Sequence, residues 1–293
     1  MTIISPKPEW LRRRLPTSPE YEKMRKLMQQ NCLHTVCQEA CCPNQWECFS
    51  EKTATFLIMG PVCTRNCRFC AVAYGKPADP DPDEPTRVAA AAKSLGLTYV
   101  VITSVTRDDL LDGGATGFAK TIEAVRQAMP DAGIEVLIPD FQGNPAALKT
   151  VLQSDPTVLN HNIETVPRLY PLVRPQAEYA RSLNLLAEST SLFPHIPVKS
   201  GMMLGMGETE DEIFAVLKAL RAHGCSRLTL GQYLQPTQNH LKVERYVPPQ
   251  EFDRWRQTAM EMGFIRPTCG PFVRSSYHAG IIHYADSYRT KRH

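Results

Sequence analysis

The chain has 293 residues, of which 43% are hydrophobic and 22% charged, and its formal net charge is +3. This composition is typical of a globular protein with a sizeable core, and so small a net charge argues against a nucleic-acid binder. No apolar run reaches the roughly 18 residues of a membrane-spanning helix, and the N-terminal stretch lacks the apolar region of a secretory signal. We therefore expect a cytoplasmic protein with no nucleic-acid or membrane partner.

Eight of the ten cysteines lie between Cys32 and Cys70, and the other two are Cys225 and Cys269. A reducing compartment does not support a disulfide framework, and structural cysteines would be scattered through the core. This clustering therefore predicts metal or redox chemistry.

The first group of cysteines lies in residues 1–52, an extension rich in proline and arginine that precedes the first predicted strand. The stretch TVCQEACCPNQWECFS spaces Cys37, Cys42 and Cys48 as C-x4-C-x5-C. Cys32 and Cys41 fall outside this register, and we interpret them as non-ligands.

From residue 53 onward, short β-branched runs alternate with segments of helical spacing, such as 84–96, 118–129 and 210–224. The predicted strands are 53–60, 99–105, 134–139, 157–164, 196–205 and 227–234. Six strand–helix units predict an α/β fold with a parallel sheet, either open and doubly wound or an incomplete barrel. Polar residues at the carboxyl ends of the strands favour an incomplete (β/α)6 TIM-like barrel over 53–234. We expect residues 1–52 and 235–293 to be extensions packed over its open end.

A second group of cysteines, in GPVCTRNCRFCAV, follows the first predicted strand. Cys63, Cys67 and Cys70 are spaced C-x3-C-x2-C, so they can hold three irons of a cubane cluster and leave the fourth open. A structural zinc site needs four ligands, and no second half-site is present in this motif. Arg65 and Arg68 are candidates to offset the negative charge of such a cluster, with plain solvent exposure as the alternative.

This motif, with Phe69 before the last cysteine, resembles the signature of the radical S-adenosylmethionine superfamily. The resemblance implies a 4Fe–4S cluster whose open iron binds S-adenosylmethionine and reduces it. The 5′-deoxyadenosyl radical that is then released removes hydrogen from unactivated carbon.

The extension motif TVC…CPN…EC resembles that of the lipoyl synthase family, as does the RSSY motif within 269–280. The resemblance implies a second, auxiliary 4Fe–4S cluster on Cys37, Cys42 and Cys48. It also implies Ser276 as the fourth ligand, with Ser275 as the alternative. Without the resemblance, both serines would read as caps of a turn.

Three further segments resemble the same family, namely 103–115, 160–175 and 199–209. Asn160, Asn162 and Glu164 would share one face of a strand. The candidate cofactor contacts are Phe69, Thr103, Ser104, Gly113, Gly114, Asn162, Glu164, Arg174 and Lys199.

The resemblance implies insertion of two sulfur atoms at C6 and C8 of an octanoyl chain amide-linked to a lysine, with the auxiliary cluster as sulfur donor. The implied partners are octanoylated lipoyl carrier domains (dehydrogenase-complex E2 subunits and the glycine cleavage H protein), a ferredoxin or flavodoxin, and an iron–sulfur cluster carrier. Arg12, Arg13 and Arg14 are candidates to steer carrier docking.

Two alternatives remain at this point. One is another sulfur-inserting radical enzyme, biotin-synthase-like or methylthiolating. The other, from a different class, is a two-cluster electron-transfer protein, although such carriers usually fill all four ligand positions with cysteine.

Overall fold

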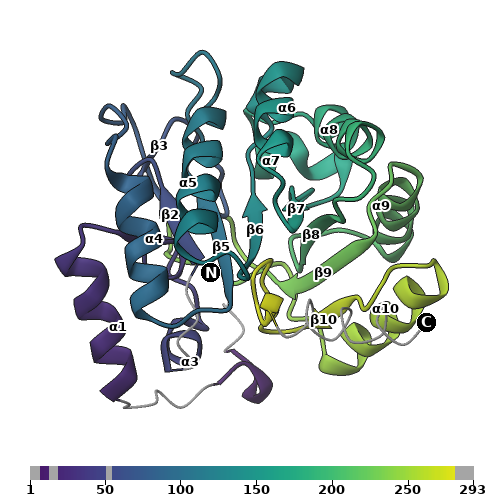
Figure 1. The fold of residues 1–293 in the computed structure, drawn as a ribbon. Helices are drawn as coiled ribbons and strands as arrows, with labels where there is room; N and C mark the ends of the chain where they lie inside the picture. Colours follow the sequence, from purple (N-terminus) through teal and green to yellow (C-terminus); the bar gives the residue numbers. More distant parts are fainter. Residues whose placement is uncertain (1–6, 13–18, 51–54, 281–293) are drawn as a thin grey trace, which may run out of the picture.

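The structure is a computed structural model, and it describes residues 7–12, 19–50 and 55–280 (Figure 1). Its main sheet has the strand order β1-β2-β5-β6-β7-β8-β9-β10. The strands are β1 (His34–Thr35), β2 (Thr55–Ile58), β5 (Tyr99–Ser104), β6 (Gly133–Leu137), β7 (Val158–Asn160), β8 (Val198–Leu204), β9 (Arg227–Gln232) and β10 (Thr268–Gly270). All neighbouring pairs are parallel except β1 with β2.

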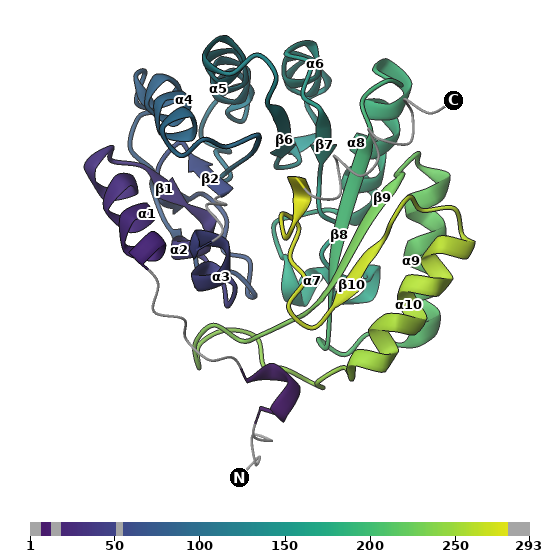
Figure 2. The same cartoon turned by 60° about the horizontal axis from the view of Figure 1, so that its bottom comes forward.

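Helices cover the outer face of this curved sheet, as Figure 2 shows. The longer ones around the barrel are α4 (Glu84–Ser94), α5 (Ala115–Ala128), α6 (Pro145–Gln153), α8 (Tyr179–Leu192), α9 (Glu210–Ala222) and α10 (Pro249–Glu261). They alternate with the strands along the chain, which is the arrangement that a parallel sheet requires. The predicted incomplete (β/α)6 barrel is confirmed, and among the described strands β1 and β10 are the two open edges of the sheet.

Local sequence explains why these elements form where they do. The strands β2 and β5 are almost entirely buried, as expected for strands covered on both faces. The helix α9 begins with a capping box in which Thr209 and Glu212 each satisfy the other's backbone N–H. The apolar faces of the helices pack on the sheet and form one continuous core.

Both extensions add strands to the edges of the barrel sheet. His34 and Thr35 pair antiparallel with β2 at one edge, and β10 pairs with β9 at the other. The N-terminal extension also contains α1 (Pro19–Gln30), α2 (Val36–Glu39) and α3 (Gln45–Ser50). After β10, the chain turns back into the opening between the two edges (Figure 2). The extensions are therefore hydrogen bonded into the sheet as well as packed over the opening.

The predicted strand 157–164 is shorter than expected. The strand β7 ends at Asn160, and pairing resumes only at an isolated bridge between Glu164 and Met202. Glu164 has a positive φ of 64°, which an extended strand does not allow.

None of the described helices is long and apolar enough to span a membrane.

Candidate functional site

A cavity of about 450 Å³ lies inside the barrel and is shared by both groups of cysteines. Strand residues, the loops that follow the strands, the N-terminal extension and the segment after β10 all line it. The predicted site residues on its wall are Cys37, Cys42, Cys48, Cys63, Cys67, Phe69, Cys70, Thr103, Ser104, Asn162, Glu164, Arg174 and Ser276. The topology thus brings together residues that are more than 200 positions apart in the sequence.

The first group, which we call the barrel-loop triad (Cys63, Cys67 and Cys70), lies on the loop after β2. Cys63 belongs to β3 (Val62–Cys63), which pairs with β4 (Ala73–Tyr74). Its Sγ accepts backbone N–H groups from Arg65 at 3.4 Å and Thr106 at 3.3 Å. Such N–H donors to sulfur are a feature of cluster thiolates.

Burial raises the pKa of Cys67 and raises that of Cys70 to about 12, and the neighbouring cysteines and Glu164 add to both shifts. The three thiols are therefore close enough to repel one another when ionised. Thiolates gathered in this way need a cation to stabilise them.

The loop of this triad is fastened to the barrel by Arg65. Its guanidinium group is buried and donates to Asp108 at 2.6 and 2.9 Å and to Asp140 at 2.7 and 2.9 Å. This corrects the expectation that Arg65 offsets the charge of a cluster, because two carboxylates already balance it. Arg68 is exposed, which agrees with the alternative interpretation of plain solvent exposure. The arginine beside the thiols is Arg174, which lowers the pKa of Cys67 against the larger effect of burial.

The second group, which we call the extension triad (Cys37, Cys42 and Cys48), lies on and around α2 and α3. The N-cap of α2 is Thr35, whose hydroxyl accepts the backbone N–H of Gln38. The pKa of Cys37 is raised chiefly by burial and further by Cys42 and Cys48. These three thiols therefore also converge.

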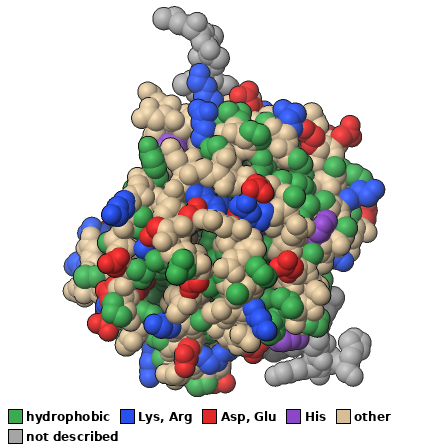
Figure 3. Space-filling model, turned by 90° about the horizontal axis from the view of Figure 1, so that it is seen from above, with side chains coloured by type: hydrophobic (Ala, Val, Ile, Leu, Met, Phe, Trp, Pro, Cys, Tyr) green, Lys and Arg blue, Asp and Glu red, His purple; other side chains and the backbone are tan. Residues whose placement is uncertain are grey.

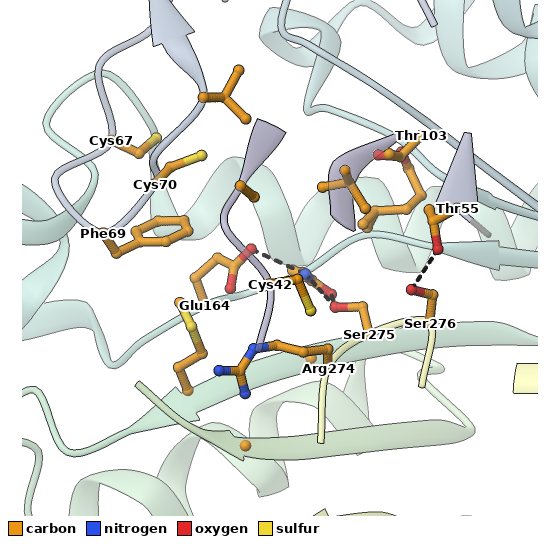
Figure 4. A pocket seen from close by; sticks show the side chains of 18 of the residues that line it. Cys42, Thr55, Cys67, Phe69, Cys70, Thr103, Glu164, Arg274, Ser275 and Ser276 are labelled. Carbon is orange, nitrogen blue, oxygen red and sulfur yellow. Dashed lines mark hydrogen bonds between the residues drawn. The ribbon is translucent and has the colours of Figure 1, made fainter. Parts of the chain in front are cut away.

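The two serines of the RSSY motif have different partners (Figure 4). Thr55 Oγ1 donates to Ser276 Oγ at 2.7 Å, and the backbone of Thr55 hydrogen bonds the thiol of Cys37. Ser275 instead bonds Asn162, which lies after β7. Ser276 is thus linked to Cys37 through Thr55, and its role as the fourth ligand stays a prediction.

The residues present fit iron–sulfur clusters better than single metal ions. All ten cysteines are free thiols. Within the described part of the chain, no three His, Cys, Asp or Glu side chains converge tightly enough to hold one ion. A cluster binds each thiolate at a different iron, so its ligands need not converge on one ion.

Comparisons with known proteins agree with this site. Residues 57–239 match the Radical SAM superfamily. The chain is 60% identical over 273 residues to lipoyl synthase of Desulfotalea psychrophila, covering 93% of this chain and 91% of that protein. It is 56% identical over 275 residues to lipoyl synthase of Chlorobium phaeovibrioides, covering 94% and 96% respectively. The chain belongs to the lipoyl synthase family.

Solved structures agree on the fold of this lipoyl synthase family member. Methylornithine synthase (PylB) matches with a TM-score of 0.55 at 14% identity, covering 86% of this chain and 75% of that one. HydG, a maturase of the [FeFe]-hydrogenase, matches with a TM-score of 0.57 at 13% identity, covering 85% and 56%. The family match and the named relatives, and not these structures, show that the protein is an enzyme of the radical S-adenosylmethionine class, whose lipoyl synthases use this cofactor and 4Fe–4S clusters.

Three predicted cofactor contacts lie away from the cavity wall. Lys199 is buried and pairs with Glu135 at 2.8 Å, deeper in the barrel. Gly113 and Gly114 lie before α5, where a side chain on Gly114 would meet Met59 Sδ at 2.5 Å. These two glycines permit a tight turn and close packing, so their contact with the cofactor stays a prediction that the cavity does not support, as does that of Lys199.

The prediction that Asn160, Asn162 and Glu164 share one face is wrong. Asn160 points to Glu135, whereas Asn162 and Glu164 bond each other at the cavity. The cause is the break after β7, which turns the chain between Asn160 and Asn162.

Sequence reasoning passed over two residues that line the cavity and one that contacts the barrel loop. Thr55 lies on β2 and faces the cavity, and Arg274 opens the RSSY motif. His240 follows the last predicted strand, and its Nε2 lies 3.0 Å from the backbone oxygen of Cys70. Only Arg274 carried a usable signal, its place in a recognised motif.

Proposed function

We propose that this chain inserts two sulfur atoms at C6 and C8 of an octanoyl chain carried on a lysine of a lipoyl carrier protein. The observation that carries the proposal is that both cysteine triads and Ser276 line one cavity. The identity over almost the full length of named lipoyl synthases favours this reaction over biotin-synthase-like, methylthiolating or electron-transfer alternatives.

We assign the barrel-loop triad to the cluster that binds S-adenosylmethionine, and the extension triad with Ser276 to the auxiliary cluster. When bound, the first cluster supplies the electron that cleaves the cofactor, and the second supplies sulfur. Glu164, Asn162 and Arg174 lie close to the barrel-loop triad and are the candidates to hold the cofactor. Arg174 Nε is buried and lacks a partner within the described residues, which supports Arg174 as a candidate to donate to a ligand oxygen.

The cavity wall suits an alkyl chain. Leu57, Leu137, Met202, Met203 and Val273 contribute apolar side chains between the polar groups. An apolar wall with a few placed polar groups is the usual form of a small-molecule site. The unreactive C–H bonds of the substrate would therefore lie against hydrocarbon, with the polar chemistry at either end.

The remaining partners are proposals that follow from this reaction. The substrate carriers would be dehydrogenase-complex E2 subunits and the glycine cleavage H protein, electrons would come from ferredoxin or flavodoxin, and a cluster carrier would restore the auxiliary site. We also propose a cytoplasmic location and a chain made of an N-terminal extension (1–52), a barrel core (53–234) and a C-terminal extension (235–293).

Of the arginines proposed to steer carrier docking, Arg12 is exposed, while Arg13 and Arg14 lie outside the described residues. The face in Figure 3 mixes acidic, basic and hydrophobic side chains, so it does not mark a docking patch by charge.

Substitutions in the two triads test the assignment. Cys37→Ala should leave release of 5′-deoxyadenosine intact but abolish thiolation of an octanoyl-lysine peptide, whereas Cys63→Ala should abolish both. Both products are measured by mass spectrometry after anaerobic reconstitution. Cys32→Ala, at an exposed cysteine outside the triads, is the control and should retain both reactions. Full thiolation by Cys37→Ala would refute the assignment.

A further inference from the structure

A chain of hydrogen bonds crosses the cavity from the loop after β7 to the C-terminal segment (Figure 4). Asn162 Nδ2 donates to Glu164 Oε1 at 3.0 Å and to Ser275 Oγ at 2.6 Å. Ser275 Oγ returns a bond to Asn162 Oδ1 at 3.0 Å. Asn162 therefore uses both of its amide N–H groups and its oxygen in this chain.

The two ends of the chain lie at different triads. Glu164 lines the cavity together with Cys67 and Cys70 of the barrel-loop triad. At the other end, Ser275 directly precedes Ser276, whose hydroxyl bonds Thr55 next to Cys37. Only the side chains of Asn162 and Ser275 therefore lie between Glu164 and the residue next to Ser275, which is Ser276.

The chain is held tightly by the strand beneath it. A side-chain carbon on Gly201 of β8 would lie 2.7 Å from Asn162 Oδ1 and 3.2 Å from Ser275 Oγ. The backbone oxygen of Asn162 also accepts a bond from Arg174 Nη1 at 3.2 Å. With the backbone fixed, a ligand that accepts a hydrogen bond from Asn162 competes with Glu164 and Ser275 for its two side-chain N–H groups.

We propose that Asn162 and Ser275 are positioning residues that couple occupancy of the cofactor site beside Glu164 to the position of Ser276. This inference rests on the proposed function, because it takes Ser276 as the auxiliary-cluster ligand. Coupling between two sites is reciprocal, so if cofactor binding affects Ser276, a change at Ser276 should in turn alter cofactor affinity.

A double-mutant cycle on the full chain with both clusters reconstituted tests this coupling. Dissociation constants for S-adenosylmethionine are measured by equilibrium binding for the parent, Ser276→Ala, Ser275→Ala and the double variant. Ser276→Ala should change the dissociation constant by about 5-fold or more in the parent, the usual lower range of such coupling. The same substitution should change it less than about 2-fold when Ser275 is already alanine, because the connection is then lost.

The control is Ser226→Ala, which removes a serine hydroxyl that bonds the backbone of Val198 away from the cavity. It should leave cofactor affinity at the parent value. Equal effects of Ser276→Ala in both backgrounds, or none in either, would overturn the inference. Thiolation by the parent is measured in parallel. A parent that does not thiolate the octanoyl substrate would count against the proposed function, whereas a parent that thiolates it but shows no coupling in the binding cycle would count against the inference alone.

A second measurement covers the case in which Ser275→Ala loses its auxiliary cluster. Mössbauer spectra of the parent, with only the auxiliary iron labelled, should change when the cofactor is added. The Asn162→Ala variant should retain the labelled iron, and its spectrum should not respond to cofactor added at a concentration that equilibrium binding shows to saturate this variant. A parent spectrum that is indifferent to the cofactor would contradict the coupling.

Discussion

The barrel-loop triad and the extension triad line the same cavity, but the chain holds them by different means. The barrel loop is fixed by buried ion pairs from Arg65 and by backbone bonds such as Thr64 N–H to Thr106 O at 3.0 Å. Cys37 and Cys48 of the extension triad lie on the short helices α2 and α3, and Cys42 lies between them. Hydrogen bonds to a distant segment complete the surroundings of this triad. Asn44 Nδ2 donates to Phe272 O at 2.6 Å, and Tyr277 Oη donates to Glu47 at 2.9 Å.

This difference suits the two tasks proposed for the triads. A cluster that is reused in every cycle benefits from a loop that the barrel core keeps in place. A cluster that gives up its sulfur must open and be rebuilt, so its surroundings are better made of parts that can separate. We therefore expect damage to the barrel loop to spread through the fold, and damage to the extension contacts to stay local.

The largest effect should come from Arg65→Ala. The substitution removes the Arg65 guanidinium, which supplies much of the positive charge beside Asp140, and the side chain of Asp140 is 0% exposed. Breaking a buried ion pair from one side costs about 3–5 kcal/mol. Denaturant unfolding of the protein without clusters measures this loss. The exposed pair of Arg168 with Glu212 provides the control, and Arg168→Ala should change the free energy of unfolding far less. A similar loss in both variants would remove the contrast between buried and exposed pairs.

The same ion pair should give the fold a dependence on acid. Burial opposes ionisation of Asp140, but the hydrogen bonds and charge of Arg65 outweigh it and lower the pKa to about 2. Because the unfolded carboxyl titrates near 4, this group stabilises the fold above about pH 4, and the contribution disappears as the pH falls toward 2. It amounts to about 2 kcal/mol. Urea unfolding of the parent minus that of Asp140→Asn should show this slope, and parallel curves would contradict it.

On the extension side, Gly231→Ala should displace the C-terminal segment. Its side-chain carbon would lie 2.1 Å from Val273 O, a backbone atom that cannot step aside by rotation. Overpacking of this kind costs about 1–3 kcal/mol. We expect thiolation to fall at least tenfold while 5′-deoxyadenosine release persists. Gly270→Ala is the matched control, because its carbon would meet only the Val273 side chain, at 3.3 Å. Parent-level thiolation by Gly231→Ala would show that the segment is not seated as described.

The sequence predicted the barrel and both triads because these depend on local signals. Alternation of strands and helices, cysteine spacing and the RSSY motif can each be read from short windows. The paired partners of Arg65 could not be read in this way, because Asp108 and Asp140 lie 43 and 75 positions away. The break after β7 was also missed, since Asn160, Asn162 and Glu164 alternate as a regular strand would.

Lys199 shows a further limit of reading one sequence. A lysine on a barrel strand can point to a ligand or to a buried carboxylate, and the strand pattern is the same in either case. Here Lys199 forms an ion pair with Glu135, which is two strands away in the sheet order. Register between strands, which sets that pairing, depends on the whole sheet and not on the strand itself.

The smallest effect should come from Asn44→Ala, which removes a single bond between the extension and the C-terminal segment. Asn44 is buried, and its bond to Phe272 O spans 228 positions of sequence. Losing one such bond costs about 1 kcal/mol. Hydrogen exchange should quicken over residues 36–48 and 271–277 and stay at parent rates over 62–70, because only the extension side loses a contact. Gln45→Ala, at the neighbouring position, should leave all three segments unchanged. Faster exchange over 62–70 in Asn44→Ala would mean that the two triads share one cooperative unit, and the contrast between them would not hold.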